Sequence, residues 1–296
     1  MSPASTRYPY RSITDPVPYT WPRGNGLAVY VAVNLEIYLP NAAHLDEFVP
    51  NPARPDLINH GWLDWGNRVG AWRLLEAMVE NGIPATALVN SKLYDEAPGL
   101  IEAWRDAGAE IAAHGRTNGE TQAGLSEVSE RALIKEATDA ITLHEGRAPA
   151  GWLSPWIAET DVTPDLLAEA GYSYVLDWGA DDRPFHLHTR AGPLMAMPYP
   201  QEANDANAIA VRRMGAPAFC DLCLKQLDEM VRQAEAGPLV CAFALHPHII
   251  AQAHRLHDFR KVLVRLAELR REIWLTTAGE IARTAETTSA VNPETE

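Results

Sequence analysis

Three side chains of this sequence, Glu36, His114 and His246, could together hydrolyse an amide bond. Each lies at the end of an apolar, strand-like run: LAVYVAV leads to the glutamate, EIAA to the first histidine and LVCAFAL to the second. Because the carboxyl ends of parallel strands in a barrel meet at one end, we expect these side chains to converge there. A carboxylate near two histidines supplies a base for water, a donor for the developing oxyanion and an acid for the leaving nitrogen.

Three more groups are expected at the same strand ends: Trp152, Asp177 and Trp178. The two tryptophans could stack on a substrate or pack in the wall, and the aspartate could bind substrate or cap a loop. A competing interpretation makes Glu36 a buried ion pair with Arg68 or Arg73, whereas Arg68 could also contact substrate. For the histidines the competing interpretation is a core side chain bonded to backbone.

Strand-like and helix-like patterns alternate along the chain. The predicted strands cover residues 27–33, 83–90, 110–113, 151–153, 172–177, 194–198, 239–246 and 273–276. The predicted helices cover residues 65–81, 99–107, 127–145, 163–170, 217–236 and 257–271, followed by a closing helix that Thr277 and Glu280 begin. Alternation at this spacing predicts a parallel sheet, and seven or eight units favour a (β/α) barrel.

The whole chain, residues 1–296, is expected to form a single domain. Residues 1–25 are rich in Pro, Tyr and Ser and predict an extended N-terminal arm. Residues 38–64 contain four prolines and no lasting period, which predicts a long loop over the barrel mouth, the end where the strands finish.

Composition narrows the class of partner. The 296 residues carry 25 Lys and Arg against 39 Asp and Glu, a net charge of −14 without a basic run. Nucleic acid and membrane are therefore not expected partners, and no apolar run reaches the ~20 residues of a membrane span. The three cysteines, Cys220 and Cys223 among them, are expected to pack in the core. A cytoplasmic protein is the default expectation.

Several motifs resemble the polysaccharide deacetylase superfamily, and more closely its branch of metal-independent allantoinases and cyclic imide hydrolases. They are WPRG (21–24), NLE (34–36), WGNRVGAWRLL (65–75), EIAAHG (110–115), GW (151–152), DDRPF (181–185), PYPQEAND (198–205) and LHPHIIAQAHR (245–255). The resemblance covers about residues 7–285. It implies a distorted (β/α) barrel of seven to eight parallel strands and a homo-oligomer.

The resemblance also implies where a metal would bind in the metal-dependent members. There a metal carboxylate follows the catalytic base, and two histidines lie four residues apart; here Ile37 and Asn118 replace the carboxylate and the second histidine. Isoleucine cannot be a ligand and one histidine is too few, so we expect no cofactor. The deacetylase arginine that orients the base is also absent near Leu153, which leaves the orientation of Glu36 unexplained.

These residues lead to a functional hypothesis: hydrolysis of a small cyclic amide, imide or ureide without a metal. Glu36 is the expected base, with its pKa raised by burial, His246 the acid, and His114 a donor to the carbonyl or the water. Asn118 could bind substrate or close a turn. One alternative is an N-deacetylase of acetylated sugars that recruits zinc through His114 and His246; another is an inactive barrel that binds carbohydrate or protein.

Overall fold

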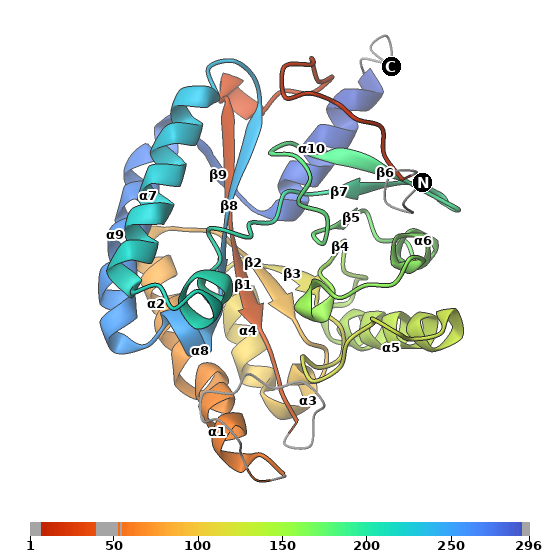
Figure 1. Ribbon diagram of the computed structural model, residues 1–296, viewed down its shortest axis with the longest axis vertical. Coiled ribbons are helices and arrows are strands. Elements are labelled where there is room, and N and C mark those ends of the chain that lie inside the picture. The colour runs from red at the N-terminus through yellow and green to blue at the C-terminus, as the bar shows by residue number, and fades with distance from the viewer. Residues whose placement is uncertain (1–6, 40–52, 54, 292–296) are drawn as a thin grey trace.

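A nine-stranded sheet curls through the centre of the structure, with helices along its outer face (Figure 1). The computed structural model describes residues 7–39, 53 and 55–291. The strands are β1 (Leu27–Leu35), β2 (Ala85–Val89), β3 (Glu110–Ala113), β4 (Gly151–Trp152), β5 (Tyr174–Val175), β6 (Phe185–Thr189), β7 (Gly192–Ala196), β8 (Leu239–Leu245) and β9 (Trp274–Thr276). Their order is β6-β7-β5-β4-β3-β2-β1-β8, with β9 also paired to β1.

The predicted (β/α) barrel is confirmed, with one strand that the sequence did not reveal. All neighbouring pairs are parallel except β6 with β7, which form an antiparallel hairpin. The hairpin turns at residues 190–191, and Gly192 begins the second strand with a φ of 112°, a conformation that glycine adopts without strain. Two histidines and a threonine in FHLHT lower the apolar content of β6, and this concealed the strand.

The helices follow the predicted alternation and add three short segments. They are α1 (Leu57–Trp65), α2 (Ala71–Asn81), α3 (Leu93–Glu96), α4 (Pro98–Asp106), α5 (Glu127–Glu145), α6 (Thr163–Glu169), α7 (Ala216–Gln233), α8 (Pro247–Ile250), α9 (Ala253–Glu268) and α10 (Ala278–Val291). α5 has the predicted bounds, because Ser126 caps its first turn and Gly146 ends it in the left-handed region.

The predicted loop at residues 38–64 is wrong in its last third. Residues 57–64 form most of α1, which Asp56 caps by accepting a hydrogen bond from the backbone N–H of Asn59. Polar residues and a glycine within LINHGWLDW hid its helical period. Residues 40–52 and 54, on which the rest of the loop prediction depends, lie outside the described residues.

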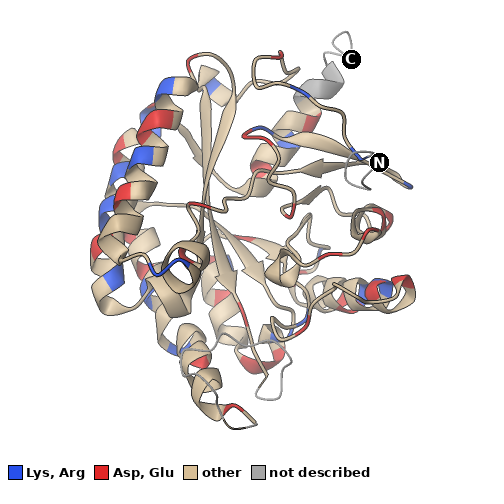
Figure 2. Cartoon of the chain, viewed as in Figure 1, with Lys and Arg blue, Asp and Glu red and all other residues tan. Residues whose placement is uncertain are grey.

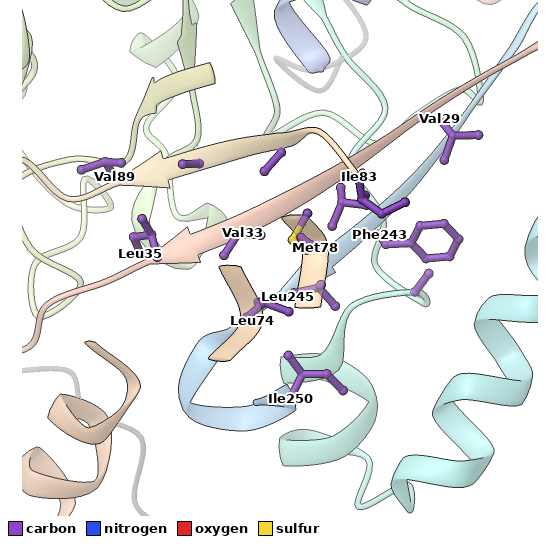
Figure 3. Close-up of a cluster of buried hydrophobic side chains, with 14 of the residues drawn as sticks. Val29, Val33, Leu35, Leu74, Met78, Ile83, Val89, Phe243, Leu245 and Ile250 are labelled. Atoms are coloured by element: carbon purple, nitrogen blue, oxygen red, sulfur yellow. The ribbon is translucent and has the colours of Figure 1, made fainter. Parts of the chain in front are cut away.

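Side chains alternate between the two faces of β1 and so between two apolar clusters. Odd-numbered residues such as Val29, Val33 and Leu35 point outward, where they pack against Leu74 and other helical side chains (Figure 3). Even-numbered residues such as Tyr30 point into the barrel, whose interior cluster includes residues of β2, β5, β7 and β8. Both faces of β1 are therefore buried, as in other parallel sheets.

Charged side chains lie mainly on the surrounding helices, among them α5, α7 and α9 (Figure 2). Within the strands of the described chain, Glu110 is the only Asp, Glu, Lys or Arg. Its carboxylate accepts hydrogen bonds from Tyr174, Thr86 and the backbone of Gly279. None of the described helices combines the length and apolarity that crossing a bilayer requires.

The described part of the N-terminal arm, from Arg7 to Asn25, packs against the barrel. Tyr19 and Trp21 are buried, and the indole N–H of Trp21 donates to the Leu239 carbonyl. Arg183 donates to three backbone carbonyls of the arm, between residues 12 and 15. The expected extended arm is thus held by aromatic packing and by one buried guanidinium; residues 1–6 lie outside the described residues.

Close backbone packing places the segment after β8 against the π-helical segment Gly66–Gly70. A Cβ at Gly70 would lie 2.4 Å from the carbonyl oxygen of Pro247 and one at Gly66 would lie 2.9 Å from the Cβ of His248. Residue 247 directly follows His246, so these two glycines help to set the position of that histidine.

We expect Gly70→Ala to lower the free energy of unfolding by about 1–3 kcal/mol, because backbone must move to admit the methyl group. Gly61→Ala is the matched control: it lies in α1 with no atom within 4 Å of its added Cβ. There alanine should stabilise the helix by about 0.5–1 kcal/mol. Chemical denaturation of both variants tests this, and equal effects would contradict the packing argument.

Candidate active site

Strand register brings Glu36, Asn90 and His114 to one level of the barrel mouth. Leu35 pairs with Val89, and Val89 in turn pairs with Ala113; these residues belong to the outward cluster. The residue after each therefore points inward, because side chains alternate along a strand. Asn90 ties the three ends together, since it accepts from the Ile37 N–H (2.8 Å) and donates to the His114 carbonyl.

His246 enters from the other side of β1. Val33 pairs with Leu245, so His246 lies level with Asn34, two residues before Glu36, and also points inward. An isolated parallel bridge between Asn204 and Ala244 brings the segment after β7 alongside β8. This bridge places Asp205 against His246 and extends the curl of the sheet.

The carboxylate of Glu36 lies between the two imidazoles. Its Oε1 is 3.4 Å from Nε2 of His114 and 3.6 Å from Nε2 of His246. Its Oε2 accepts a hydrogen bond from the Tyr38 hydroxyl at 2.8 Å, and Asn67 donates to its backbone carbonyl at 2.7 Å. Tyr38 therefore orients the carboxylate in a structure that lacks the deacetylase arginine.

Fixed acceptors determine which nitrogen of each histidine faces the glutamate. Nδ1 of His114 donates to the Leu153 carbonyl at 2.8 Å, and Nδ1 of His246 donates to Asp205 at 2.7 Å. Asp205 is fully buried and also accepts from the backbone N–H of His246. Each Nδ1 thus carries a proton, so a proton gained at Nε2 makes an imidazolium next to the carboxylate.

The pKa of Glu36 moves opposite to the sequence-based expectation. Burial is the largest influence and raises the pKa, but the charge of His246, the hydrogen bond from His114 and the charges of His114 and His248 outweigh it. The net result is a pKa of about 2. Glu36 is therefore ionised at neutral pH, as a base must be, but its intrinsic basicity is low.

Asn118 joins this cluster through Tyr38. Its amide nitrogen donates to the Tyr38 hydroxyl at 2.9 Å, and its backbone N–H donates to the Ile37 carbonyl at 2.8 Å. The indole of Trp156 donates to the Asn118 backbone carbonyl at 2.7 Å. Asn118, which replaces the second metal-binding histidine of the deacetylases, thus lies in the site and is connected to the Glu36 carboxylate through hydrogen bonds.

The residues present do not fit the metal site of the deacetylases. Ile37 packs against the outward apolar cluster, so neither its chemistry nor its direction replaces a carboxylate ligand. The Asn118 amide nitrogen is occupied with Tyr38. Across the residues that the structure describes, no three His, Cys, Asp or Glu side chains form a group that could hold a metal ion.

Two of the residues predicted to bind substrate lie away from this cluster. Trp152 is fully buried in the outward cluster, because it pairs with Ala113 and so shares its direction. Its indole N–H donates to Ser154. The Arg68 side chain is 78% exposed and pairs with Asp64 on α1, so its alternative ion pair with Glu36 is wrong. Arg73, the other candidate for that pair, lies over the ring of Trp65.

Asp177 and Trp178 lie beyond β5 and are partly buried. Asp177 accepts from the backbone and hydroxyl of Ser154, at 2.8 and 2.6 Å. Burial raises its pKa, and the same cause together with the neighbouring Asp177 charge raises the pKa of Glu159 to about 9. One proton is therefore shared within this carboxyl pair at neutral pH.

Sequence reasoning missed two residues of the cluster, Tyr38 and Asn90. Asn90 stood at the end of a predicted strand, beside His114's strand, and the strand-end rule could have included it. The PYPQEAND motif already contains Asp205, but nothing in that segment indicated its contact with His246. Nothing in the local pattern distinguished Tyr38 from other residues of the predicted loop.

Comparison with known proteins supports the resemblance seen in the sequence. Residues 61–175 match the family model of polysaccharide deacetylase. A predicted polysaccharide deacetylase of Schizosaccharomyces pombe is 22% identical, over 89% of this chain and 91% of its own.

Two solved structures share the fold over nearly the whole chain. One is a predicted polysaccharide deacetylase of Pseudomonas aeruginosa, with a TM-score of 0.83, and the other is the PuuE allantoinase, with a TM-score of 0.82. Each is 24% identical and aligns over 95% of this chain and 98% of its own. The fold inferred from the sequence motifs is confirmed.

We expect Glu36→Gln to change the pH dependence of stability. The folded pKa of about 2 lies below the ordinary value of 4.5, so the ionised carboxylate stabilises the fold above pH 4.5 and progressively less as the pH falls toward 2. The difference in free energy of unfolding between wild type and variant should therefore shrink by roughly 1–2 kcal/mol from pH 6 to pH 3. Urea denaturation across this range measures it. A difference that stays constant or grows would show that the histidines do not outweigh burial.

Proposed function

Because this chain has the fold of the polysaccharide deacetylases and matches their family model, we propose that it is a hydrolase of non-peptide carbon–nitrogen bonds. One observation carries the proposal: an ionised, buried carboxylate lies between two histidines whose Nε2 atoms both face it. Such a group can take a proton from water and return one to a leaving nitrogen.

We propose further that the substrate is a small cyclic amide, imide or ureide. The described residues do not match the metal ligands of the deacetylases, so they do not form the site that would hold a metal ion as a strong Lewis acid. A carboxylate with a pKa of about 2 is also a weak base. Both features suit an imide or ureide, in which a second carbonyl on the nitrogen makes it a better leaving group. The similarity in fold to an allantoinase agrees with this substrate class.

The roles of the three residues follow from their contacts. Glu36 accepts a proton from water as the water oxygen attacks the substrate carbonyl, and His114, in its imidazolium form, donates a hydrogen bond from Nε2 to the oxyanion. His246 acts in its imidazolium form: its Nε2 proton passes to the ring nitrogen as the carbon–nitrogen bond breaks. Asp205 holds Nδ1 of His246 and stabilises its imidazolium before that transfer. The proton that Glu36 took from water then passes to Nε2 of His246, 3.6 Å away, which restores both groups. The product is an open chain with a new carboxylate and a freed amide or amine.

The competing candidate is an N-deacetylase of acetylated sugars with zinc bound through His114 and His246. The convergence of their Nε2 atoms on Glu36 favours it, as does the match of residues 61–175 to the polysaccharide deacetylase model. The two candidates differ in substrate and in response to chelator, so one screen separates them.

We expect turnover of at least one ring compound in a panel of allantoin, hydantoin, dihydrouracil and succinimide, with N-acetylglucosamine oligomers as the alternative substrate. Activity should survive a chelator and gain nothing from added zinc. Glu36→Gln should lower kcat by about 10²–10⁴-fold, because the amide cannot accept the proton. Activity confined to the acetylated sugar and dependent on zinc would favour the deacetylase. No turnover of any compound by folded protein would favour an inactive barrel.

Asp205→Asn should lower kcat/KM by about 10²–10⁴-fold while leaving the protein folded. The neutral amide can accept a hydrogen bond from Nδ1 of His246, but it cannot compensate the positive charge of the imidazolium. Asp221→Asn is the matched control: it removes the same charge from an exposed ion pair on α7. Steady-state kinetics and thermal denaturation are measured for both. Equal activity of the Asp205 variant and wild type would exclude His246 as the acid.

A further inference from the structure

The amide oxygen of Asn118 is a feature of the site that its own hydrogen bonds do not explain. The side chain is 4% exposed, and Oδ1 is shielded from solvent. Within the described residues, this oxygen has no hydrogen-bond partner. A buried acceptor without a donor is unfavourable, and such groups in folded proteins call for a physical explanation.

The hydrogen-bond chain from Asn118 through Tyr38 to Glu36 determines which atom of the Asn118 amide has no partner. Ionised Glu36 can only accept, so the Tyr38 hydroxyl must donate its proton to Oε2. The hydroxyl then accepts, and only the NH₂ group of Asn118 can donate to it. Rotating the amide by 180° would place two acceptors against each other. The unpartnered atom is therefore the carbonyl oxygen, an acceptor.

The neighbourhood of Asn118 suits a planar ring. Its NH₂ group is connected to the Glu36 carboxylate by two hydrogen bonds through Tyr38. A small ring whose carbonyl lies next to Glu36 could therefore also reach the Asn118 amide. Trp156 bonds to the same residue through the Asn118 backbone carbonyl and is 44% exposed. Trp156 and Ile157 both adopt positive φ, 62° and 54°, a costly backbone for two successive non-glycine residues. That strained turn directs the indole toward Asn118.

We propose that Oδ1 of Asn118 accepts a hydrogen bond from a ring N–H of the substrate and thereby selects N–H-bearing imides and ureides. This inference rests on the proposed ring-opening function and names its substrate class. An acetylated sugar has its amide N–H outside any ring, whereas imides and ureides hold the N–H within the ring that contains the attacked carbonyl. A site that holds an N–H strongly rejects the analogue without it, since the acceptor is then left unpaired.

The test compares each substrate with its N-methyl analogue: succinimide with N-methylsuccinimide, and hydantoin with its 1-methyl and 3-methyl forms. In wild type, kcat/KM should be about 10²-fold or more higher for the N–H compound in at least one pair. Asn118→Leu should remove most of that preference, by lowering kcat/KM for the N–H compound far more than for the methylated one.

Tyr38→Phe is the matched control, since it breaks the same hydrogen-bond chain but acts through Glu36. It should lower kcat/KM for both members of a pair by a similar factor and keep the preference. Equal loss for both members in Asn118→Leu would show a structural role only and overturn the inference. If that variant does not fold, wild type alone decides, because equal turnover of N–H and N-methyl compounds overturns the inference while leaving ring hydrolysis intact. Failure to hydrolyse any ring, with turnover of acetylated sugar, would instead overturn the proposed function.

Discussion

A single carboxylate oxygen between two imidazole nitrogens is the interaction on which this site depends. A buried carboxylate is costly unless opposite charge and hydrogen bonds compensate it, and here both compensations are present. His114 and His246 supply the charge, and Tyr38 supplies a hydrogen bond to the other oxygen. The surrounding architecture holds these groups in place: Asp205 on one imidazole, the Leu153 carbonyl on the other, and Asn90 between two strand ends.

The pKa of Glu36 shows how neighbours can reverse the effect of burial. From the sequence, the apolar residues on either side indicated desolvation and hence a raised pKa. Those side chains, Leu35 and Ile37, point toward the outer cluster, whereas the carboxylate faces the histidines. Adjacent residues in a strand lie on opposite faces, so they say little about each other's surroundings. The direction of the pKa shift of Glu36 therefore depends on contacts across the barrel, which form only when the chain folds.

Much of the fold and the centre of the site could be predicted from the sequence. The apolar runs of β1, β3 and β8 identified the strands, and the rule that chemistry lies at strand ends led to Glu36, His114 and His246. The same rule failed for Trp152, because it ignores direction: that residue is paired with Ala113 and points outward. Asp205 depends on a bridge between Asn204 and Ala244, a contact between segments about 40 residues apart. No local pattern encodes such a contact.

Strand register also constrains how this protein can vary in length. One residue inserted within β8 would turn His246 from the barrel interior toward the helices, even if all the neighbouring residues kept their types. The same holds for β1 and β3, whose pairing determines the direction of Glu36 and His114. Insertions are compatible with this chemistry mainly in the connecting segments after the strands. Such barrels are thus expected to diversify in their connecting segments. Within the strands that carry the site residues, only insertions or deletions of an even number of residues keep these side chains pointing inward.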